Sequence, residues 1–130
     1  MYDVKNSIKI YISGLCDDNK IGSYAILVTH NYNVIKTLKS VVRKTSLENI
    51  YFRALLEILD FYKTPMRFTV YIDNNDFINT LNSLQENSYW YNKISYNFKK
   101  HIIDLKAIEF DDDFSDYAKL LSKKCLYYDN

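Results

Sequence analysis

The stretch Arg67-Phe-Thr-Val-Tyr-Ile-Asp-Asn-Asn-Asp76 determines how the rest of this chain is interpreted. Phe68, Val70 and Ile72 alternate with other β-branched and aromatic residues, which is typical of a buried strand. A helical pattern begins directly after it, so Asp73 stands at the carboxyl end of the strand. Ligands and catalytic groups gather at that end of the strands in open α/β sheets. Asp73 is therefore the first candidate functional residue.

Three further strands are expected earlier in the chain, over residues 7–13, 22–29 and 34–42. They are rich in strand-forming residues and are joined by short polar turns, so the pattern predicts an antiparallel meander. Gly14 is expected to end the first strand. The third strand carries several lysine and arginine side chains, which is the pattern of a sheet edge that is kept from pairing with other molecules.

The helix expected next begins at its cap, Ser46, and ends before Pro65, with apolar residues at three-and-four spacing. In the last helix, which Asp113 caps, the residues at helical spacing are Tyr117, Leu120, Leu121 and Lys124. No linker or internal repeat interrupts the chain, so residues 1–130 are expected to form a single domain. The elements after Asp73 are a helix over 76–84, a helical stretch over 88–101, a strand over 105–110 and the last helix over 114–124.

Composition narrows the class of protein. The apolar and charged fractions are those of a globular chain and exclude fibrous, disordered and membrane classes, while a formal charge of +1 provides no global basic field for nucleic acid. Two distant cysteines, Cys16 and Cys125, and no apolar signal segment predict an intracellular, cytoplasmic location. The abundance of Tyr, Asn, Ile and Lys indicates an AT-rich genome, such as that of a virus or a mobile element.

The element order and several short motifs resemble the ribonuclease H family. Gly22-Ser-Tyr-Ala-Ile-Leu27 is similar to the family's glycine-led second strand, Tyr71-Ile-Asp-Asn74 to its fourth strand, and Phe114-Ser-Asp-Tyr-Ala-Lys-Leu120 to its final helix. Tyr11-Ile-Ser-Gly-Leu-Cys16 and Asn49-Ile-Tyr-Phe-Arg-Ala54 stand where the family has its first-strand and first-helix motifs. The resemblance spans nearly the whole chain. It implies an α/β, ribonuclease H-like fold with a five-stranded mixed sheet (β-β-β-α-β-α-β-α) and helices on both faces.

The resemblance also implies a catalytic mechanism. Ribonucleases H cleave the RNA strand of an RNA/DNA hybrid with two magnesium ions held by four carboxylates, since Mg²⁺ prefers oxygen ligands and a metal pair clamps the attacking and leaving oxygens. Asp73 and Asp116 stand at two of these catalytic and metal-binding positions, in the fourth strand and the last helix. On this alignment Ser13 replaces the first-strand acid and Tyr51 replaces the first-helix acid.

These two substitutions predict that ordinary two-metal hydrolysis is lost or weakened. The Ser13 hydroxyl is a neutral and weaker ligand than a carboxylate, and the Tyr51 ring is expected to fill space that a metal and its waters would need. The leading interpretation is a pseudoenzyme that requires no cofactor, with Mg²⁺ or Mn²⁺ as the cofactor if activity survives.

A displaced metal cluster is the alternative to a pseudoenzyme. Asp17 and Asp18 follow the first strand and Asp111 to Asp113 precede the last helix, so these acids could join Asp73 and Asp116 in a divergent metal-dependent endoribonuclease. Asp17 is the extra metal ligand to consider first. The structural explanation is that Asp17 and Asp18 are turn residues and that the acids near the last helix favour its N-terminus.

A second candidate surface runs from Tyr89 to His101, where aromatic residues alternate with cations. It lies where many ribonucleases H carry a basic handle that grips the hybrid, and lysines with aromatic rings suit nucleic acid. The alternative is a helix that packs Trp90, Ile94 and Phe98 into the core. The candidate nucleic-acid-binding residues are Asn49, Asn74, Trp90, Lys93, Lys99 and Lys100.

Three functions therefore follow from the sequence. The first is a catalytically inactive ribonuclease H-like module that binds nucleic acid, either RNA/DNA hybrid or RNA, or a protein partner in a nucleic-acid-processing complex. The second is the divergent nuclease. The third is a structural interaction protein, which would form a homodimer through a sheet edge or a tyrosine-rich surface.

Overall fold

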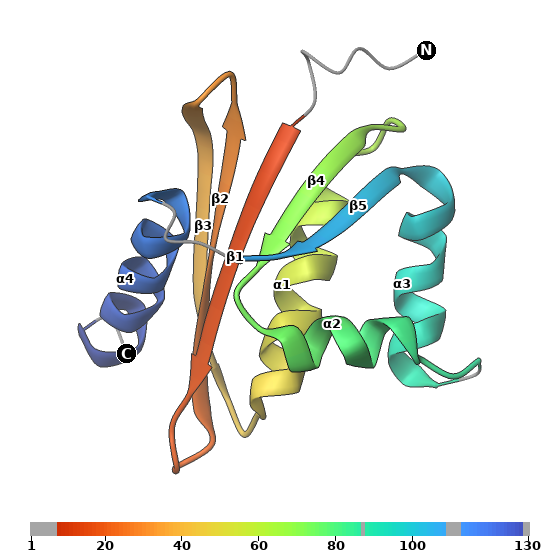
Figure 1. Ribbon diagram of the computed structural model, residues 1–130. Coiled ribbons are helices and arrows are strands. Elements are labelled where there is room, and N and C mark those ends of the chain that lie inside the picture. Colours follow the sequence, from red (N-terminus) through yellow and green to blue (C-terminus); the bar gives the residue numbers. More distant parts are fainter. Residues whose placement is uncertain (1–7, 87, 109–112, 129–130) are drawn as a thin grey trace.

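The computed structural model describes residues 8–86, 88–108 and 113–128 (Figure 1). Its element order confirms the predicted succession of strands and helices. Among the described residues, no helix has both the length and the apolar composition that crossing a membrane requires. The elements are β1 (Ile8–Cys16), β2 (Ile21–His30), β3 (Asn33–Arg43), α1 (Leu47–Phe61), β4 (Arg67–Ile72), α2 (Asn75–Asn82), α3 (Tyr89–Lys100), β5 (Ile102–Ala107) and α4 (Asp113–Tyr128).

The strands form one five-stranded mixed sheet in the order β3-β2-β1-β4-β5. The first three strands are antiparallel neighbours, and β4 lies parallel to both β1 and β5. The turn between β2 and β3 contains Asn31 and Tyr32 at φ angles of 52° and 65°, and positive φ at both central residues is the geometry of a tight hairpin. The lysine-rich β3 is an edge strand, as predicted.

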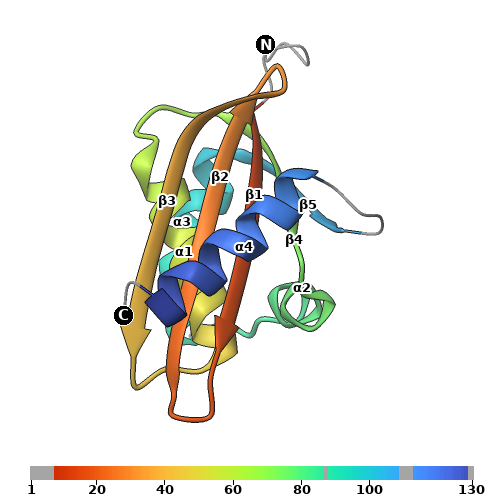
Figure 2. The same ribbon diagram turned by 90° about the vertical axis from the view of Figure 1, so that its left-hand side faces the viewer.

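Helices cover both faces of the sheet, as the fold prediction required (Figures 1 and 2). Ile10 and Ile12 of β1 point toward α1 and join a large apolar cluster that includes the fully buried Phe52. Tyr11 lies between them in sequence and points to the opposite face, where it packs with Ala118 of α4 in a smaller cluster. Alternation along β1 thus divides its side chains between the two layers.

The chain's two glycines allow α1 to lie close to the sheet. A Cβ atom added at either Gly14 or Gly22 would lie 2.7 Å from the side chain of Ile50, which is shorter than real contacts of this kind. The sequence predicted that Gly14 ends the first strand, but β1 continues through Gly14 to Cys16. The close approach places Tyr51, the next residue of α1, beside the end of β1.

The buried face of α4 differs from the predicted one. Tyr117 and Leu120 are each 48% exposed, whereas Ala118, Ser122 and Cys125 are buried. Small side chains let the helix lie close to β2, where the Ser23 hydroxyl donates to the Ser122 carbonyl at 2.6 Å. Sequence periodicity gave more weight to the larger apolar residues, which here face outward.

Two element boundaries also differ from those predicted. Strand β5 begins at Ile102, three residues before the predicted start at position 105, and the predicted end at Phe110 lies outside the described residues. Helix α4 continues to Tyr128, about one turn beyond the predicted end, because the buried Cys125 and Leu126 extend its sheet-facing side.

Candidate functional site

Three side chains from three elements meet at the carboxyl end of β4. The Ser13 hydroxyl in β1 donates a hydrogen bond to Asp73 Oδ2 at 2.7 Å, and the Tyr51 hydroxyl in α1 donates to Asp73 Oδ1 at 2.5 Å. Ser13 and Tyr51 are buried, while Asp73 is half-buried. Both oxygens of the single carboxylate are therefore engaged by neutral hydroxyl groups. The signal for this arrangement was present in the sequence, because both substituted positions carry hydroxyls.

Burial, ring stacking and hydrogen bonds fix the position of Tyr51. Only 2% of the residue is exposed, its ring stacks on Phe77 with 5.3 Å between ring centroids, and its oxygen accepts a hydrogen bond from the Gly14 N–H at 3.3 Å. Burial, followed by the charge of Asp73, raises the pKa of Tyr51 above its ordinary value. The phenol therefore stays protonated at neutral pH and keeps donating to Asp73.

The residue after Asp73 caps the following helix. Asn74 Oδ1 accepts a hydrogen bond from the Phe77 N–H at 2.9 Å, which is the N-cap arrangement for α2. The sequence left open whether Asp73 itself has this role. Because Asn74 is the cap, the Asp73 carboxylate is left to face Ser13 and Tyr51.

The other candidate acids lie in different surroundings. Asp17 Oδ1 accepts hydrogen bonds from the N–H groups of Asn19 and Ile21 at 2.9 and 3.0 Å, so this side chain organises the turn after β1. Asp18 in the same turn is exposed, and Asp116 is exposed in the first turn of α4.

No three-ligand metal cluster forms within the part of the chain that the structure describes. Residues 8–86, 88–108 and 113–128 contain no group of three or more His, Cys, Asp or Glu side chains that could hold a metal ion. Asp73, Asp116 and Asp17 are therefore not brought together as one ligand set. Asp111 and Asp112, which the sequence offered as substitutes, lie outside the described residues.

Trp90 of α3 is directed toward α1. Its indole N–H donates to Asn49 Oδ1 at 3.2 Å, and its ring stacks on the buried Phe52 at 4.8 Å with only 6° between the planes. Trp90 and Asn49 are both predicted to contact nucleic acid, and in the structure they are bonded to each other. One face of the indole is covered by the core.

The candidate lysines of α3 are associated with aromatic residues. Lys93 lies over the ring of Tyr89 and Lys100 over that of Tyr96, with 4.9 and 5.5 Å from nitrogen to ring centroid. Both tyrosines are 65% exposed. This side of α3 therefore presents cations and aromatic rings together.

The core-facing side of α3 matches the predicted one at Trp90 and Ile94 and departs from it at Phe98. Ile94 is buried as expected, but Phe98 is 36% exposed, and Asn97 is buried in its place. Asn97 Nδ2 donates to Asp60 Oδ1 of α1 at 2.8 Å, which gives the buried amide a polar partner. The prediction used apolar residues spaced at four, and it could not identify the polar Asn97 as a core residue.

His101 ends α3 as a buried neutral side chain and not as a surface cation. Its Nδ1 accepts from the Met66 N–H at 3.0 Å, and Nε2 lies 3.2 Å from the Leu59 carbonyl. An acceptor at Nδ1 places the proton on Nε2, which donates to Leu59. Burial lowers the pKa of His101.

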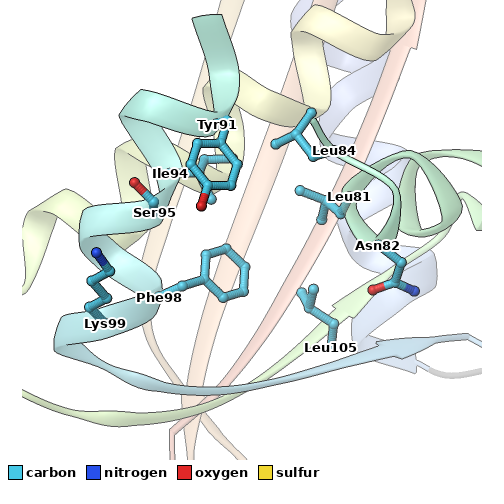
Figure 3. Close-up of a pocket in the computed structure, with 9 residues that line it drawn as sticks. All are labelled: Leu81, Asn82, Leu84, Tyr91, Ile94, Ser95, Phe98, Lys99 and Leu105. Atoms are coloured by element: carbon cyan, nitrogen blue, oxygen red, sulfur yellow. The ribbon is translucent and has the colours of Figure 1, made fainter. Parts of the chain in front are cut away.

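A groove that the sequence did not predict lies between α2, α3 and β5 (Figure 3). Its volume is about 300 Å³. The apolar signal was present, but it was divided among three elements that the sequence could not place side by side. The groove is lined by Leu81, Asn82, Leu84, Tyr91, Ile94, Ser95, Phe98, Lys99 and Leu105.

Comparisons with known proteins identify the fold. No family model and no curated protein matches the chain. Among solved structures, the chain is similar to the crystal structure of LC11-RNase H1 in complex with an RNA/DNA hybrid, with a TM-score of 0.74 and 15% sequence identity over 92% of this chain and 96% of that chain. At this identity the likeness concerns the fold alone. The chain therefore has the ribonuclease H-like fold.

Proposed function

We propose that this chain is a binding module in which the catalytic centre of the ribonuclease H-like fold is closed, and that its ligand is nucleic acid. The observation that carries the proposal is the hydrogen bonding of Asp73, whose two carboxylate oxygens accept from Ser13 and Tyr51. A catalytic carboxylate must offer its lone pairs to metal ions, and in this arrangement one lone pair of each oxygen accepts a hydroxyl proton.

The donor set around Asp73 does not fit a pair of magnesium ions. Two adjacent divalent cations require several negative ligands, and Asp73 supplies one carboxylate beside two neutral hydroxyls. Metal binding would also break both hydrogen bonds and leave the buried Tyr51 hydroxyl facing a cation. The raised pKa of Tyr51 opposes its conversion to a phenolate ligand. The proposed function therefore requires no metal cofactor.

Nucleic acid is the favoured ligand because of the charge and aromatic content of α3. The helix carries Lys93, Lys99 and Lys100 and no acidic residue. Lysines contribute to binding through phosphates, and exposed rings stack on bases. Since Trp90 is turned toward the core, the stacking role passes to Tyr89 and Tyr96, which lie under lysines on the exposed side. LC11-RNase H1, which shares the fold, is seen with an RNA/DNA hybrid.

A cleavage assay tests the closed centre. We expect no cleavage of labelled RNA/DNA hybrid, single-stranded RNA or DNA in Mg²⁺ or Mn²⁺, either by the natural protein or by Asp73→Asn. Cleavage by the natural protein that disappears in Asp73→Asn would contradict the proposal and favour the divergent nuclease.

A gain-of-binding variant tests the same point without relying on activity. Ser13→Asp combined with Tyr51→Glu would place two further carboxylates beside Asp73. We expect Mn²⁺ to raise the melting temperature of this variant and not that of the natural protein, because a ligand that binds only the folded state stabilises it. The matched control, Ser13→Asn with Tyr51→Gln, has similar shapes without the charges. Equal stabilisation of the natural protein by Mn²⁺ would contradict a closed centre.

Binding to hybrid at several salt concentrations tests the ligand. Replacing Lys93 and Lys100 with glutamate is expected to weaken binding at least ~10-fold and to reduce the salt slope by about two, since each lost phosphate contact lowers that slope by about one. The control replaces Lys119 and Lys123, exposed lysines of α4 on the opposite face of the sheet. Equal losses in the two variants would exclude α3 as a specific binding surface.

A further inference from the structure

The groove between α2, α3 and β5 exposes apolar side chains that a folded protein ordinarily covers. Phe98 is 36% exposed on one wall, and Leu81 of α2 and Leu105 of β5 are half-buried opposite it (Figure 3). Ile94 forms part of the same wall as Phe98 and is buried. Apolar pockets with a few polar groups at the rim are the usual form of a binding site.

The polar groups of the groove are few and lie around the apolar surface. Asn82 extends from α2, and Ser95 and Lys99 extend from α3, while the Tyr91 hydroxyl points into the space between the helices (Figure 3). These groups offer hydrogen bonds to a backbone or a side chain that lies across the opening. The volume of about 300 Å³ suits one or two large apolar side chains rather than an extended ligand.

The lining of the groove carries one positive charge and no negative one. Lys99 is the single charged residue among the nine that line it. Lys93 and Lys100 add to the positive charge of α3, which has no acidic residue. Asp104 precedes Leu105 and therefore points to the other face of the sheet, where it lies 3.8 Å from Lys106. A negatively charged partner is thus the complementary one.

We propose that this groove binds an acidic peptide segment of a partner protein, which inserts a leucine or phenylalanine between α2 and α3 while its carboxylates face Lys99. The side chains of Leu81, Leu84, Ile94 and Leu105 offer no donor or acceptor to a base edge, so a protein side chain matches the interior better than a nucleotide. The inference goes beyond nucleic acid binding. It shares Lys99 of α3 with the proposed nucleic-acid surface, so competition with hybrid is used to separate the two proposals.

Fluorescence anisotropy with designed peptides tests the proposal. The probe is a labelled ten-residue peptide with two leucines and one phenylalanine at helical spacing among glutamates. One control peptide has lysine for every glutamate, and a second has serine for every apolar residue. We expect saturable binding of the acidic apolar peptide and at least ~10-fold weaker binding of both controls, which corresponds to about 1.4 kcal/mol.

Two variants of the protein locate the binding. Ser95→Trp fills the groove without changing charge, and Lys99→Glu reverses the charge at its rim; each is expected to weaken peptide binding at least ~10-fold. Lys119→Glu is the matched control, because it makes the same charge change at an exposed lysine of α4, on the opposite face of the sheet, and it is expected to cost less than ~3-fold.

Three outcomes of the peptide assay would overturn the proposal. They are no saturable binding of the acidic peptide at up to about 1 mM, equal binding of the lysine peptide, and binding that Ser95→Trp leaves unchanged. Displacement of the peptide by RNA/DNA hybrid, together with loss of hybrid binding in Ser95→Trp, would also overturn it and assign the groove to nucleic acid. Hybrid binding that survives in Ser95→Trp while peptide binding is lost would support two separate surfaces.

Discussion

Two regions adjoin α2, and they differ in how completely their side chains are satisfied. At the end of β4, both oxygens of Asp73 accept hydrogen bonds, from Ser13 and Tyr51, and these two hydroxyl residues are buried. In the groove between α2, α3 and β5, Phe98 remains exposed and Lys99 is the lone charge. The polar cluster at the end of β4 is thus filled by its own side chains, and the groove is open to solvent.

The difference concerns how each region lowers its free energy. A buried carboxylate without a metal needs donors, because an unpaired buried charge is costly, and two hydroxyls supply them. An open apolar groove, in contrast, lowers its free energy when a partner covers it. We propose that the first region now stabilises the fold and that the second serves recognition.

Truncating one aromatic residue in each region is expected to give the largest difference in the free energy of unfolding. Tyr51→Ala removes a buried ring that packs on Phe77 and is expected to lower the free energy of unfolding by about 3–5 kcal/mol. Phe98→Ala removes a partly exposed ring and is expected to cost less than about 1 kcal/mol. Urea denaturation followed by circular dichroism measures both. Similar losses would mean that the groove is part of the core and not an open site.

Removing only the Tyr51 hydroxyl isolates its bond to Asp73. Tyr51→Phe is expected to cost about 1.5–3 kcal/mol, since a hydrogen bond to a charged group is lost. In an Asp73→Asn background the cost should shrink by at least about 1 kcal/mol, because the charged acceptor is gone. Tyr24→Phe is the control: its hydroxyl donates to the exposed Glu57, which water can solvate instead. An unchanged cost in the Asp73→Asn background would show that the two residues are not coupled.

His101 attaches α3 to the core, and its contribution to the free energy of unfolding is the smallest of the three expected effects. This contribution depends on pH. His101 is neutral when it accepts from Met66, and burial lowers its pKa below the ordinary value of about 6.5. The unfolded chain therefore takes up a proton first as the pH falls. Stability contributed by the neutral ring is complete above about pH 6.5 and is lost below it.

We expect the loss at His101 to be about 1 kcal/mol, the value of one hydrogen bond. Urea unfolding of the natural protein between neutral and mildly acidic pH measures it. His101→Gln should flatten this dependence, whereas His30→Gln, which changes the chain's other histidine, should preserve it. A dependence that survives in His101→Gln would assign it to other groups.

The predictable part of the fold was the part set by local spacing. Alternation around Phe68, Val70 and Ile72 located β4, and the polar turn at Asn31 and Tyr32 located the hairpin. The apolar face of α4 was wrong because periodicity alone does not reveal that small residues such as Ala118 are chosen for close packing. The prediction that Gly14 ends a strand was wrong for the same reason, because the missing side chain leaves space for Ile50.

The candidate site was only partly visible in the sequence. The order of the motifs predicts that Ser13 and Tyr51 stand at positions where the ribonuclease H family has acids. Their hydrogen bonds to Asp73 do not follow from it, because the residues lie 60 and 22 positions from that acid and meet only when α1 closes on the sheet. The sequence offered both a nucleic-acid-binding and a core-packing interpretation of Trp90, and the structure places its ring on Phe52.

The sequence by itself determined the order of strands and helices and the chemical type of every side chain at the end of β4, because periodicity and residue identity are properties of short segments. Only the tertiary structure decided that the hydroxyls of Ser13 and Tyr51 close on one carboxylate and that a groove opens over Leu105. Both features consist of contacts between distant segments, and such contacts depend on how closely helices approach the sheet, which is set by packing and not by local pattern.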